Sequence, residues 1–437
     1  MNDTIFALSS APGRAGVALV RVSGPEAEAC VRSLTGRGVP EPRKAVLRRL
    51  QDAAGESIDQ GLVLWFAAPA SFSGEHTAEF HVHGGRAIAA KVIATLATIP
   101  GCRPAEPGEF TRRAVENGKI DLTQAEALID LINAETDTQR CQALAQYGGA
   151  LTSLYGDWRA RLIRALAWAE AEIDFSDEEI PTDLVTRSRS ELLQIYKEIQ
   201  RHIDDARRGE IIREGIFLTV IGPPNAGKSS LINALAQRDV AIVAEMAGTT
   251  RDVIEVRLDL GGYAVIVADT TGLRAAADAV ESEGVRRAMA RAEVSDLVLL
   301  LLDSSAEDPF AGLPPGTADR ASLTVWNKTD LAAPRSLEGL RLSLKTGAGF
   351  DEVLAAITRK VSEKLDTSRE APVLTRSRHR HALEQALVAL NRAIAASDAE
   401  LHAEDLRLAV RWIGRITGRV DVEELLDVVF RDFCIGK

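Results

Sequence analysis

The sequence predicts a multidomain protein that combines α/β and all-α parts, with a mostly parallel α/β module inserted into a helical domain. Short apolar runs that end in polar motifs alternate through the centre of the chain. Leucines recur at helical spacing on both sides of that centre, and β-like runs fill the beginning. We therefore expect an N-terminal α/β domain at 1–118, a helical domain at 119–210 with 371–437, and the inserted module at 211–370.

The N-terminal domain is expected to contain strands at 16–22, 62–66 and 78–83, followed by a helix rich in alanine and isoleucine. His81 and His83 would share one face of the third strand. The sequence shows no third ligand beside them, so a metal site is not expected there.

Amphipathic helices are predicted on both sides of the central module because leucines and other apolar residues recur every three or four positions. Before the module these residues are Leu151, Leu154, Trp158, Leu162 and Leu166; after it they are Leu383, Leu387, Leu390 and Ile394, then Leu406, Val410 and Ile413. Each apolar stripe needs a partner, and pairing the stripes into one discontinuous helical domain would bury them.

Residues 222–229 read Gly-Pro-Pro-Asn-Ala-Gly-Lys-Ser, the complete pattern of a phosphate-binding loop, directly after the strand-like run 216–221. Glycines at both ends allow backbone N–H groups to turn toward a pyrophosphate. Lys228 can then reach the β- and γ-phosphates, and Ser229 can bind Mg²⁺. This motif predicts a nucleoside triphosphate site.

Further motifs follow at 248–252, 269–272, 327–330 and 343–345, and the last three come at the ends of predicted strands. Ligands bind at that edge of open α/β sheets. Asp330, in Asn-Lys-Thr-Asp, can accept hydrogen bonds from N1–H and the exocyclic amine of guanine, donors that adenine lacks. The sequence therefore predicts GTP rather than ATP.

Leu273 follows the 269–272 motif at the place where Ras-like proteins carry a glutamine that orients the attacking water. An apolar side chain cannot do this. The nearby candidates for orienting water or neutralising charge are Glu281, Arg251, Arg274 and a cation held near Asn225.

The chain has 437 residues, 46% of them apolar, and no apolar run long enough to span a bilayer, which predicts a soluble protein without a membrane partner. Residues 1–4 do not begin an export signal, so a cytoplasmic location is expected. The cysteines show neither metal-site nor disulfide-scaffold spacing, and Cys30, Cys102 and Cys141 are expected to be buried thiols.

The net charge of −11 leaves room for local basic patches. One is the run 376–381, and another is a stripe of Arg407, Arg411, Arg415 and Arg419, which share one helix face if the helix continues through Gly414 and Gly418. Two interpretations stay open: a solvated helix face, or contact with nucleic acid or an acidic partner.

Several motifs spread over the whole chain resemble the MnmE (TrmE) family of tRNA modification GTPases. They are the runs at 12–14, 21–24, 73–75, 83–85 and 107–111, the Gly-x-Pro-Asn-x-Gly-Lys-Ser loop, and the terminal Phe-Cys-Ile-Gly-Lys at 433–437. The chain departs from the family pattern at Pro223, Thr271 and Leu344, which puts nucleotide affinity and turnover in doubt.

The resemblance implies a folate-binding N-terminal domain, a discontinuous helical domain and an inserted Ras-like P-loop GTPase domain. It implies a homodimer joined through the N-terminal domains, acting with the FAD-dependent MnmG (GidA) subunit in a heterotetramer or larger complex. That complex would place an aminomethyl or carboxymethylaminomethyl group on C5 of the wobble uridine of certain tRNAs. The one-carbon donor would be 5,10-methylene-tetrahydrofolate, or a 5-formyl form would bind in its place.

The resemblance also assigns residues to roles. GTP binding is implied for Asn225, Ala226, Gly227, Lys228, Ser229, Ser230, Ala244, Thr249, Thr250, Asp269, Thr270, Thr271, Gly272, Asn327, Lys328, Asp330, Ser343, Leu344 and Lys345. Mg²⁺ ligands would be Ser229 and Thr250, and K⁺ ligands Asn225, Ala244, Met246 and Thr249. Catalytic roles fall to Glu281, Arg251 and Cys434, and folate contacts to Arg21, Glu79, Lys119 and Lys437. Glu79 and Lys119 could instead pair simply as surface charges.

Two other functions stay open at this point. One is a GTPase switch that binds ribosomal RNA during subunit assembly and performs no covalent chemistry. It would need neither a folate pocket nor a terminal Cys434. The other is a folate-dependent methyltransferase acting alone, which is weaker because the chain shows no flavin fingerprint.

Overall fold

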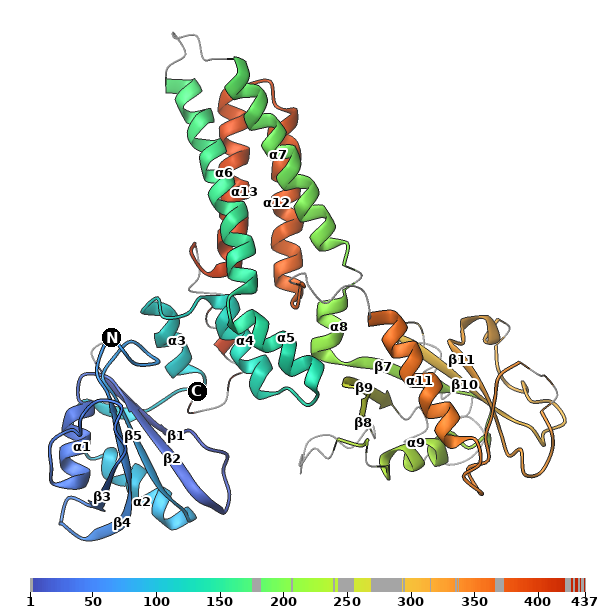
Figure 1. The fold of residues 1–437 in the computed structure, drawn as a ribbon, viewed down its shortest axis with the longest axis horizontal. Helices are drawn as coiled ribbons and strands as arrows, with labels where there is room; N and C mark the ends of the chain where they lie inside the picture. Colours follow the sequence, from blue (N-terminus) through green and yellow to red (C-terminus); the bar gives the residue numbers. More distant parts are fainter. Residues whose placement is uncertain are drawn as a thin grey trace. The chain divides into compact units, whose positions relative to one another are not determined.

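The computed structural model describes residues 3–174, 182–205, 207–238, 240–242, 255–268, 293, 295–314, 316–334, 336, 338–365, 373–420, 426, 429–430, 433 and 436. The chain divides into two compact units (Figure 1). Unit 1 comprises Met1–Ile129, Gln146–Ser188 and Arg392–Lys437, and unit 2 comprises Asp130–Ala145 and Arg189–Asn391.

Unit 1 contains a six-stranded sheet in the order β3-β4-β5-β2-β1-β6. Its strands are β1 (Thr4–Leu8), β2 (Ala15–Ser23), β3 (Val46–Gln51), β4 (Ser57–Phe66), β5 (Thr77–Gly84) and β6 (Cys102–Pro104). Helices α1 (Ala27–Thr35) and α2 (Arg86–Leu96) share one apolar core with one face of this sheet. The strands expected at 16–22, 62–66 and 78–83 are confirmed as parts of β2, β4 and β5.

The other face of β1 packs against Phe110 of α3 (Glu109–Glu116), together with Ala105. Close to α3, Leu122 of α4 (Leu122–Ile132) shares a second cluster with Phe430 and Phe433 near the end of the chain. This cluster anchors the C-terminal tail, residues 430–437, within unit 1.

Gly436 holds the tail at a second point. Its carbonyl oxygen accepts a hydrogen bond of 2.8 Å from Ser9 Oγ. Its φ is 97°, and a Cβ atom there would lie 2.3 Å from the carbonyl oxygen of Leu8. Only glycine allows this approach without a shift of the backbone.

An ion cluster around the buried Arg113 joins α3 to Asp3, which directly precedes β1. Arg113, whose side chain is 1% exposed, donates to Asp3 Oδ1 at 2.9 Å, to Glu109 Oε1 at 3.0 Å and to Glu75 at 3.2 Å. Arg103 binds Glu109 and Asp3 as well. A buried guanidinium needs such partners to offset the loss of its hydration.

The acidic members of this cluster predict how unit 1 responds to acid. Burial alone would raise the pKa of Glu109, but hydrogen bonds from Arg103, from the Glu106 backbone and from Arg113 outweigh it and hold that pKa below its ordinary value. The pKa of Asp3 is lowered in the same way, with burial opposed by Arg103 and Arg113. A carboxyl with a lowered pKa stabilises the fold above its unfolded pKa, and the contribution is lost as pH falls through the folded pKa.

We therefore expect the free energy of unfolding of unit 1 to decrease as pH is lowered from about 5 to about 3. Urea equilibration at each pH, followed by pulse hydrogen exchange read on the strand peptides, measures this. A Glu109→Gln variant should show a weaker pH dependence. Unfolding free energies that stay constant or rise over this range would contradict the role of the cluster.

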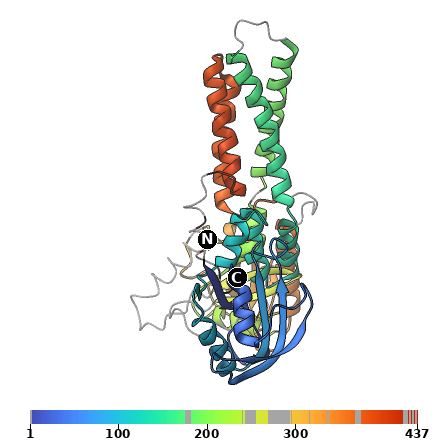
Figure 2. The same cartoon turned by 90° about the vertical axis from the view of Figure 1, so that its left-hand side faces the viewer.

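Helices α6 (Ala150–Asp174) and α13 (Ala399–Thr417) lie side by side in unit 1 (Figure 1 and Figure 2). The buried side chains of α6 alternate at spacings of four and three: Leu151, Tyr155, Trp158, Leu162, Ala165 and Ala169. The predicted stripe is therefore right at Leu151, Trp158 and Leu162, whereas Leu154 and Leu166 are only partly buried. Small alanines in the later turns allow α13 to approach closely.

The predicted arginine stripe is only partly right. Helix α13 continues through Gly414 but ends at Thr417, because Gly418 adopts a left-handed conformation as its C-cap. Arg419 is thus outside the helix. Arg407 pairs with Glu170 and Glu404, so at that position the structure shows intramolecular ion pairs.

Unit 2 contains a sheet in the order β12-β11-β10-β7-β9-β8. Its strands are β7 (Ile216–Ile221), β8 (Glu255–Leu260), β9 (Tyr263–Ala268), β10 (Leu297–Asp303), β11 (Leu323–Asn327) and β12 (Leu340–Arg341). Among the described strands of this sheet only β8 pairs antiparallel, which confirms the mostly parallel sheet.

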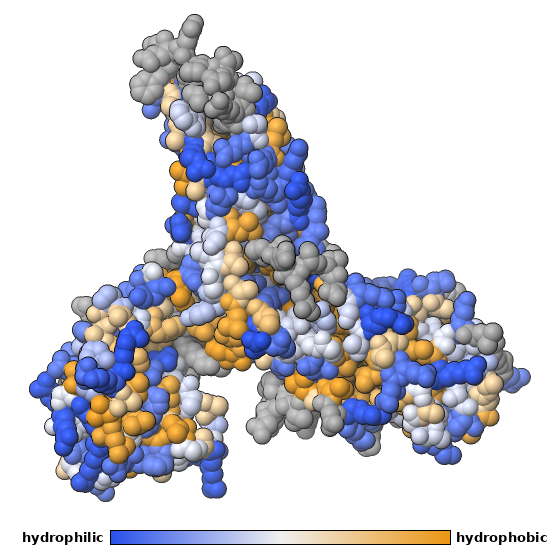
Figure 3. Space-filling model, viewed as in Figure 1, coloured by the Kyte–Doolittle hydropathy of each residue, from blue (hydrophilic) through white to orange (hydrophobic). Residues whose placement is uncertain are grey.

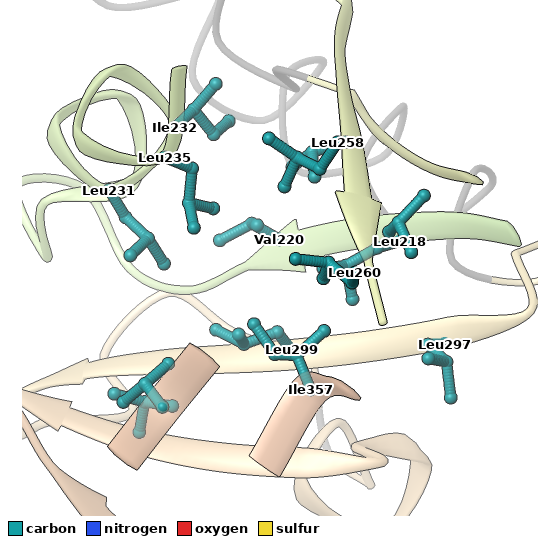
Figure 4. Packing of buried hydrophobic residues seen from close by; sticks show 14 of the residues in the cluster. Leu218, Val220, Leu231, Ile232, Leu235, Leu258, Leu260, Leu297, Leu299 and Ile357 are labelled. Carbon is teal, nitrogen blue, oxygen red and sulfur yellow. The ribbon is translucent and has the colours of Figure 1, made fainter. Parts of the chain in front are cut away.

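Strand β10 is buried on both faces, as its continuous leucine run predicts. On one side Leu299 packs with Leu231 of α9 (Lys228–Ala236) and Ile357 of α11 (Phe350–Leu365), the cluster seen in Figure 4. On the other side Leu300 packs with Trp326.

The other described helices of unit 2 are α5 (Asp137–Tyr147), α7 (Thr182–Ile203), α8 (Arg208–Glu214) and α12 (Ser377–Ala395); α5, α7 and α12 extend past the boundary of the unit. The basic run 376–381 lies at the start of α12. Arg376 pairs with Asp130 at 2.7 Å, and Arg380 pairs with Asp205 at 2.9 Å and with Glu210. These two arginines therefore bind carboxylates of their own unit.

The cysteine prediction is right for one residue. Cys30 is buried, Cys102 is partly exposed and Cys141 is exposed. Cys141 lies on the solvent side of α5 next to Asp137 and Arg140, so the expectation of a buried thiol is wrong there.

In the part of the chain that the structure describes, no helix is both long and apolar enough to cross a membrane, and no group of three potential metal ligands occurs.

Candidate functional site

The phosphate-loop motif connects β7 to α9, as predicted. A Cβ atom on Gly222 would lie 2.2 Å from the carbonyl oxygen of Leu301, so the loop passes too close to β10 for any other residue. Gly227 has a φ of 102°, and a Cβ atom there would lie 2.5 Å from Nδ2 of Asn327. Both glycines of the motif are thus required by the fold itself.

Lys228 begins α9, and its Nζ donates to the carbonyl oxygens of Gly222 at 2.9 Å and Pro223 at 2.8 Å. The ammonium therefore lies over the loop whose N–H groups precede the helix. Ser229 and Ser230 follow in the first turn. A helix N-terminus combined with this lysine favours an anion, so the loop fits a di- or triphosphate.

Asn327 ties the phosphate loop to the segment expected to flank the base. It is 3% exposed at the end of β11. Its Nδ2 donates to the carbonyl oxygen of Ala226 at 2.8 Å, and its Oδ1 accepts from the backbone N–H of Leu344 at 3.2 Å. One amide thus fixes the spacing between two parts of the site.

Asp330 is exposed, and its Oδ1 accepts a hydrogen bond of 2.7 Å from Ser343 Oγ. Ser343 is 1% exposed and is held further by the N–H of Thr346. The carboxylate is therefore oriented by a fixed hydroxyl at the edge of the site. This arrangement fits recognition of two neighbouring N–H donors.

Lys328 adopts a positive φ of 60°, and its Nζ binds Asp303 Oδ2 at the end of β10. Burial would raise the pKa of Asp303, but hydrogen bonds from Lys328 and Ser305 hold it below its ordinary value. Asp303 was missed by the sequence analysis. Its position at the carboxyl end of a buried strand was the signal that could have found it.

Leu344 packs partly against the core of unit 2. Its Cδ1 would lie 3.4 Å from a Cβ atom on Gly227, which places it beside the phosphate loop. Lys345 is exposed next to it.

Other predicted residues of the nucleotide site and the tail lie outside the described residues. They are Ala244, Met246, Thr249, Thr250, Arg251, Asp269, Thr270, Thr271, Gly272, Leu273, Arg274, Glu281, Cys434 and Lys437.

A second group of predicted residues lies in the sheet of unit 1. Arg21 on β2 stands opposite Glu79 on β5, and its Nη2 binds Glu79 Oε1 at 2.9 Å. The Arg21 guanidinium also lies 5.8 Å from the ring centroids of Phe72 and Phe110. The Arg21–Glu79 pair is thus held beside two aromatic rings, and both charged side chains stay partly exposed.

Lys119 does not take part in that ion pair. Its Nζ donates instead to the carbonyl oxygen of Pro69 at 2.9 Å. Glu79 pairs with Arg21 and His81, so the alternative of a Glu79–Lys119 surface pair is wrong. His83 pairs with Asp59. The sequence analysis did not single out Phe72 and Phe110 as neighbours of Arg21, although Phe110 lies in the 107–111 run.

Comparison with known families gives two matches. A model of the GTP-binding protein TrmE N-terminus matches residues 4–119, and a model of the MnmE helical domain matches residues 122–434. The second match runs continuously through the central residues, so it does not by itself divide the helical domain from the module expected at 211–370.

Comparison with individual proteins gives full-length matches. The tRNA modification GTPase MnmE of Parvibaculum lavamentivorans is 54% identical over 100% of both chains, and that of Paramagnetospirillum magneticum is 53% identical over 100% of both. The solved G domain of the T. maritima FeoB iron transporter is 22% identical over 33% of this chain and 98% of its own, with a TM-score of 0.25.

Proposed function

This chain belongs to the MnmE family of tRNA modification GTPases, and we propose that it adds an aminomethyl or carboxymethylaminomethyl group at C5 of the wobble uridine of certain tRNAs as the GTP-hydrolysing subunit of a complex. The observation that carries the proposal is full-length identity of 54% to a protein named as a tRNA modification GTPase. The intact phosphate loop and the oriented Asp330 support the GTPase part.

We infer three domains: 1–118 for folate binding and dimerisation, 119–210 with 371–437 as a helical domain, and 211–370 as the GTPase. The homodimer through the N-terminal domains is supported by exposed apolar side chains on the sheet of unit 1. Leu47 and Leu62 stand opposite each other and are 59% and 41% exposed, and apolar surface is visible over this sheet in Figure 3. An exposed apolar patch of this kind is typical of an interface.

In the nucleotide site, Lys228 would leave the carbonyl oxygens of the loop and contact the β- and γ-phosphates. Ser229 and Thr250 would bind Mg²⁺, which supplies charge neutralisation at the phosphates when bound. Asp330 would accept from guanine, and Asn327 would keep the 343–345 segment at its present spacing from the loop.

Leu273 cannot orient water, so hydrolysis needs other groups. We assign water orientation to Glu281, with Arg251 nearby, and a K⁺ site to Asn225, Ala244, Met246 and Thr249. A monovalent cation at the phosphates places positive charge where negative charge develops, as an arginine finger does. Closure of two GTPase domains would complete this site.

This hydrolysis scheme predicts that GTP turnover is faster in K⁺ than in Na⁺ at matched ionic strength. Asn225 has a φ of 60°, so Asn225→Gly removes the amide oxygen and keeps the backbone conformation accessible. We expect this variant to lose roughly 10- to 100-fold in K⁺-stimulated turnover and to keep its rate in Na⁺.

Steady-state phosphate release in the two salts measures this, with Gln237→Gly in the same unit as a control for an added glycine. Equal turnover of the wild-type chain in Na⁺ and K⁺ would rule out the K⁺ scheme. It would leave the tRNA role to be judged separately.

In unit 1, Arg21, Glu79 and Lys119 would hold a tetrahydrofolate, with Lys437 of the tail. The folate supplies the one-carbon unit when bound. The folate would bind to both members of the Arg21–Glu79 pair. Glu79 would accept hydrogen bonds from the pterin ring, and the basic groups would donate to the carbonyl or carboxylate oxygens of the folate. Cys434 would take part in the modification step.

The anchoring of Phe433 and Gly436 on unit 1 supports a site that includes the tail, because these two residues flank Cys434 and Ile435 in sequence. An FAD-dependent MnmG (GidA) partner would supply the redox chemistry, since the chain shows no flavin fingerprint of its own.

A further inference from the structure

Two thiols meet inside unit 1 although they are 72 positions apart in sequence. Cys30 Sγ on α1 and Cys102 Sγ at the start of β6 are 3.5 Å apart. Neither forms a disulfide in the structure. Cys30 is fully buried, whereas Cys102 is partly exposed. The contact therefore joins a fully buried cysteine to one that is partly exposed.

We propose that Cys30 and Cys102 form an oxidation site, at which a small peroxide converts the two thiols into an intramolecular disulfide bond between α1 and β6. The proposal concerns unit 1 alone and does not depend on the function proposed above.

The reaction balances with one peroxide molecule. Cys102 Sγ attacks a peroxide oxygen, the O–O bond breaks, and water leaves after taking up the thiol proton, so that Cys102 becomes a sulfenic acid. Cys30 Sγ then attacks the Cys102 sulfur, the S–O bond breaks, and a second water leaves. Two thiols lose two electrons in total, and the peroxide gains them.

The local structure allows the required movement. Disulfide formation brings the sulfur atoms from 3.5 Å to about 2.05 Å. Strand β6 is at the edge of the sheet and pairs only with β1, through Thr4, Ile5 and Phe6. A shift of β6 toward α1 therefore strains one ladder of hydrogen bonds rather than two.

The surroundings make the site slow rather than highly reactive. Burial raises the pKa of Cys30, and it raises the pKa of Cys102 against a hydrogen bond with Cys30 that lowers it; the carboxylate of Glu26 raises both. Glu26 is close to the strand, since its Cγ would lie 3.4 Å from a Cβ atom on Gly101. Both groups stay mainly as thiols at neutral pH, so oxidation should require sustained peroxide.

The test is to treat the full chain with hydrogen peroxide, block free thiols with iodoacetamide and map unreduced tryptic peptides by mass spectrometry. We expect one cross-linked pair that contains Cys30 and Cys102, is lighter by two hydrogen atoms than the two peptides, and separates on reduction. Cys141 is exposed and serves as an internal control for peroxide exposure, because it should oxidise without joining the cross-link.

Two variants make the test specific. Cys30→Ala should remove the cross-link and leave a sulfenic acid on Cys102 that dimedone traps, whereas Cys102→Ala should leave Cys30 reduced. Glu26→Gln should increase the rate of cross-linking several-fold, because it removes a carboxylate that opposes thiolate formation.

A second readout is thermal unfolding. The oxidised wild-type chain should unfold several degrees higher than the reduced chain, and both alanine variants should show no such difference. The proposal is overturned if Cys30 and Cys102 stay reduced while Cys141 oxidises, or if Cys102 is found linked to any other cysteine.

Discussion

Replacing Asp330 with asparagine is expected to lower the affinity for GTP by roughly 10²- to 10⁴-fold, the loss of two charge-assisted hydrogen bonds of about 1.5–3 kcal/mol each. Ser343 would still orient the side chain, because Ser343 Oγ now donates to Asp330 Oδ1 and the asparagine Oδ1 could accept in the same way. The amide would then present an N–H₂ group toward guanine donors, and two donors would face each other.

The same variant should gain affinity for xanthosine triphosphate, which carries a carbonyl group where guanine carries the exocyclic amine. That carbonyl can accept from the new amide. Equilibrium titration with fluorescent GTP and XTP analogues measures both effects. Asp319→Asn is a matched control, because Asp319 is exposed in the same unit and has no role assigned to it in the site. Loss of affinity for both nucleotides alike would show damage to the fold instead of a changed base preference.

Replacing Arg113 with methionine is expected to destabilise unit 1 by roughly 3–5 kcal/mol, the usual cost of removing one partner from a buried ion pair. Arg113 is 1% exposed and binds three acidic residues of unit 1. Its loss would leave Glu75 without its arginine, whereas Glu109 would keep Arg103. The Glu75 carboxylate then becomes the main uncompensated charge.

Opening free energies from hydrogen exchange in β2 and β5 measure this loss. Arg112→Met is the matched control, because Arg112 forms a half-exposed i,i+4 pair with Glu116 and should cost only about 0.3–0.5 kcal/mol. Adding Glu75→Gln to Arg113→Met should restore part of the stability, since it removes the unpaired charge. If Arg113→Met and Arg112→Met cost the same, the buried cluster does not have the role assigned to it.

Local patterns predicted the strands of unit 2 well, for a physical reason. Strands in a parallel sheet are buried on both faces, so β7 and β10 appear in the sequence as continuous apolar runs that end in polar motifs. Strand β8 was missed because its alternating polar residues, at the antiparallel edge of the sheet, resemble many exposed segments.

The predictions were weaker where two distant parts of the chain determine the outcome. Asn327 holds Ala226, 101 positions away, and Arg113 holds Asp3, 110 positions away. Cys30 and Cys102 are likewise in contact although they are 72 positions apart. Motifs identify which residue types carry chemistry, but only the folded chain shows which of them touch.

The arginine stripe shows a different limit of prediction from sequence, the placing of a helix end. The four-residue spacing was correct, but Gly418 takes a left-handed conformation and ends α13 before Arg419. A glycine at that position fits either a continued helix or a C-cap, and the choice depends on tertiary packing.

The central claim is that this chain modifies C5 of the wobble uridine. The most direct measurement is mass spectrometry of nucleosides from bulk tRNA of a strain that lacks the chain, with the wild-type chain or a Cys434→Ser variant restored. The account predicts that C5-aminomethyl uridines disappear from the deletion strain, return with the wild-type chain and do not return with the variant. An unchanged nucleoside profile in the deletion strain would contradict it and favour a GTPase switch in ribosome assembly.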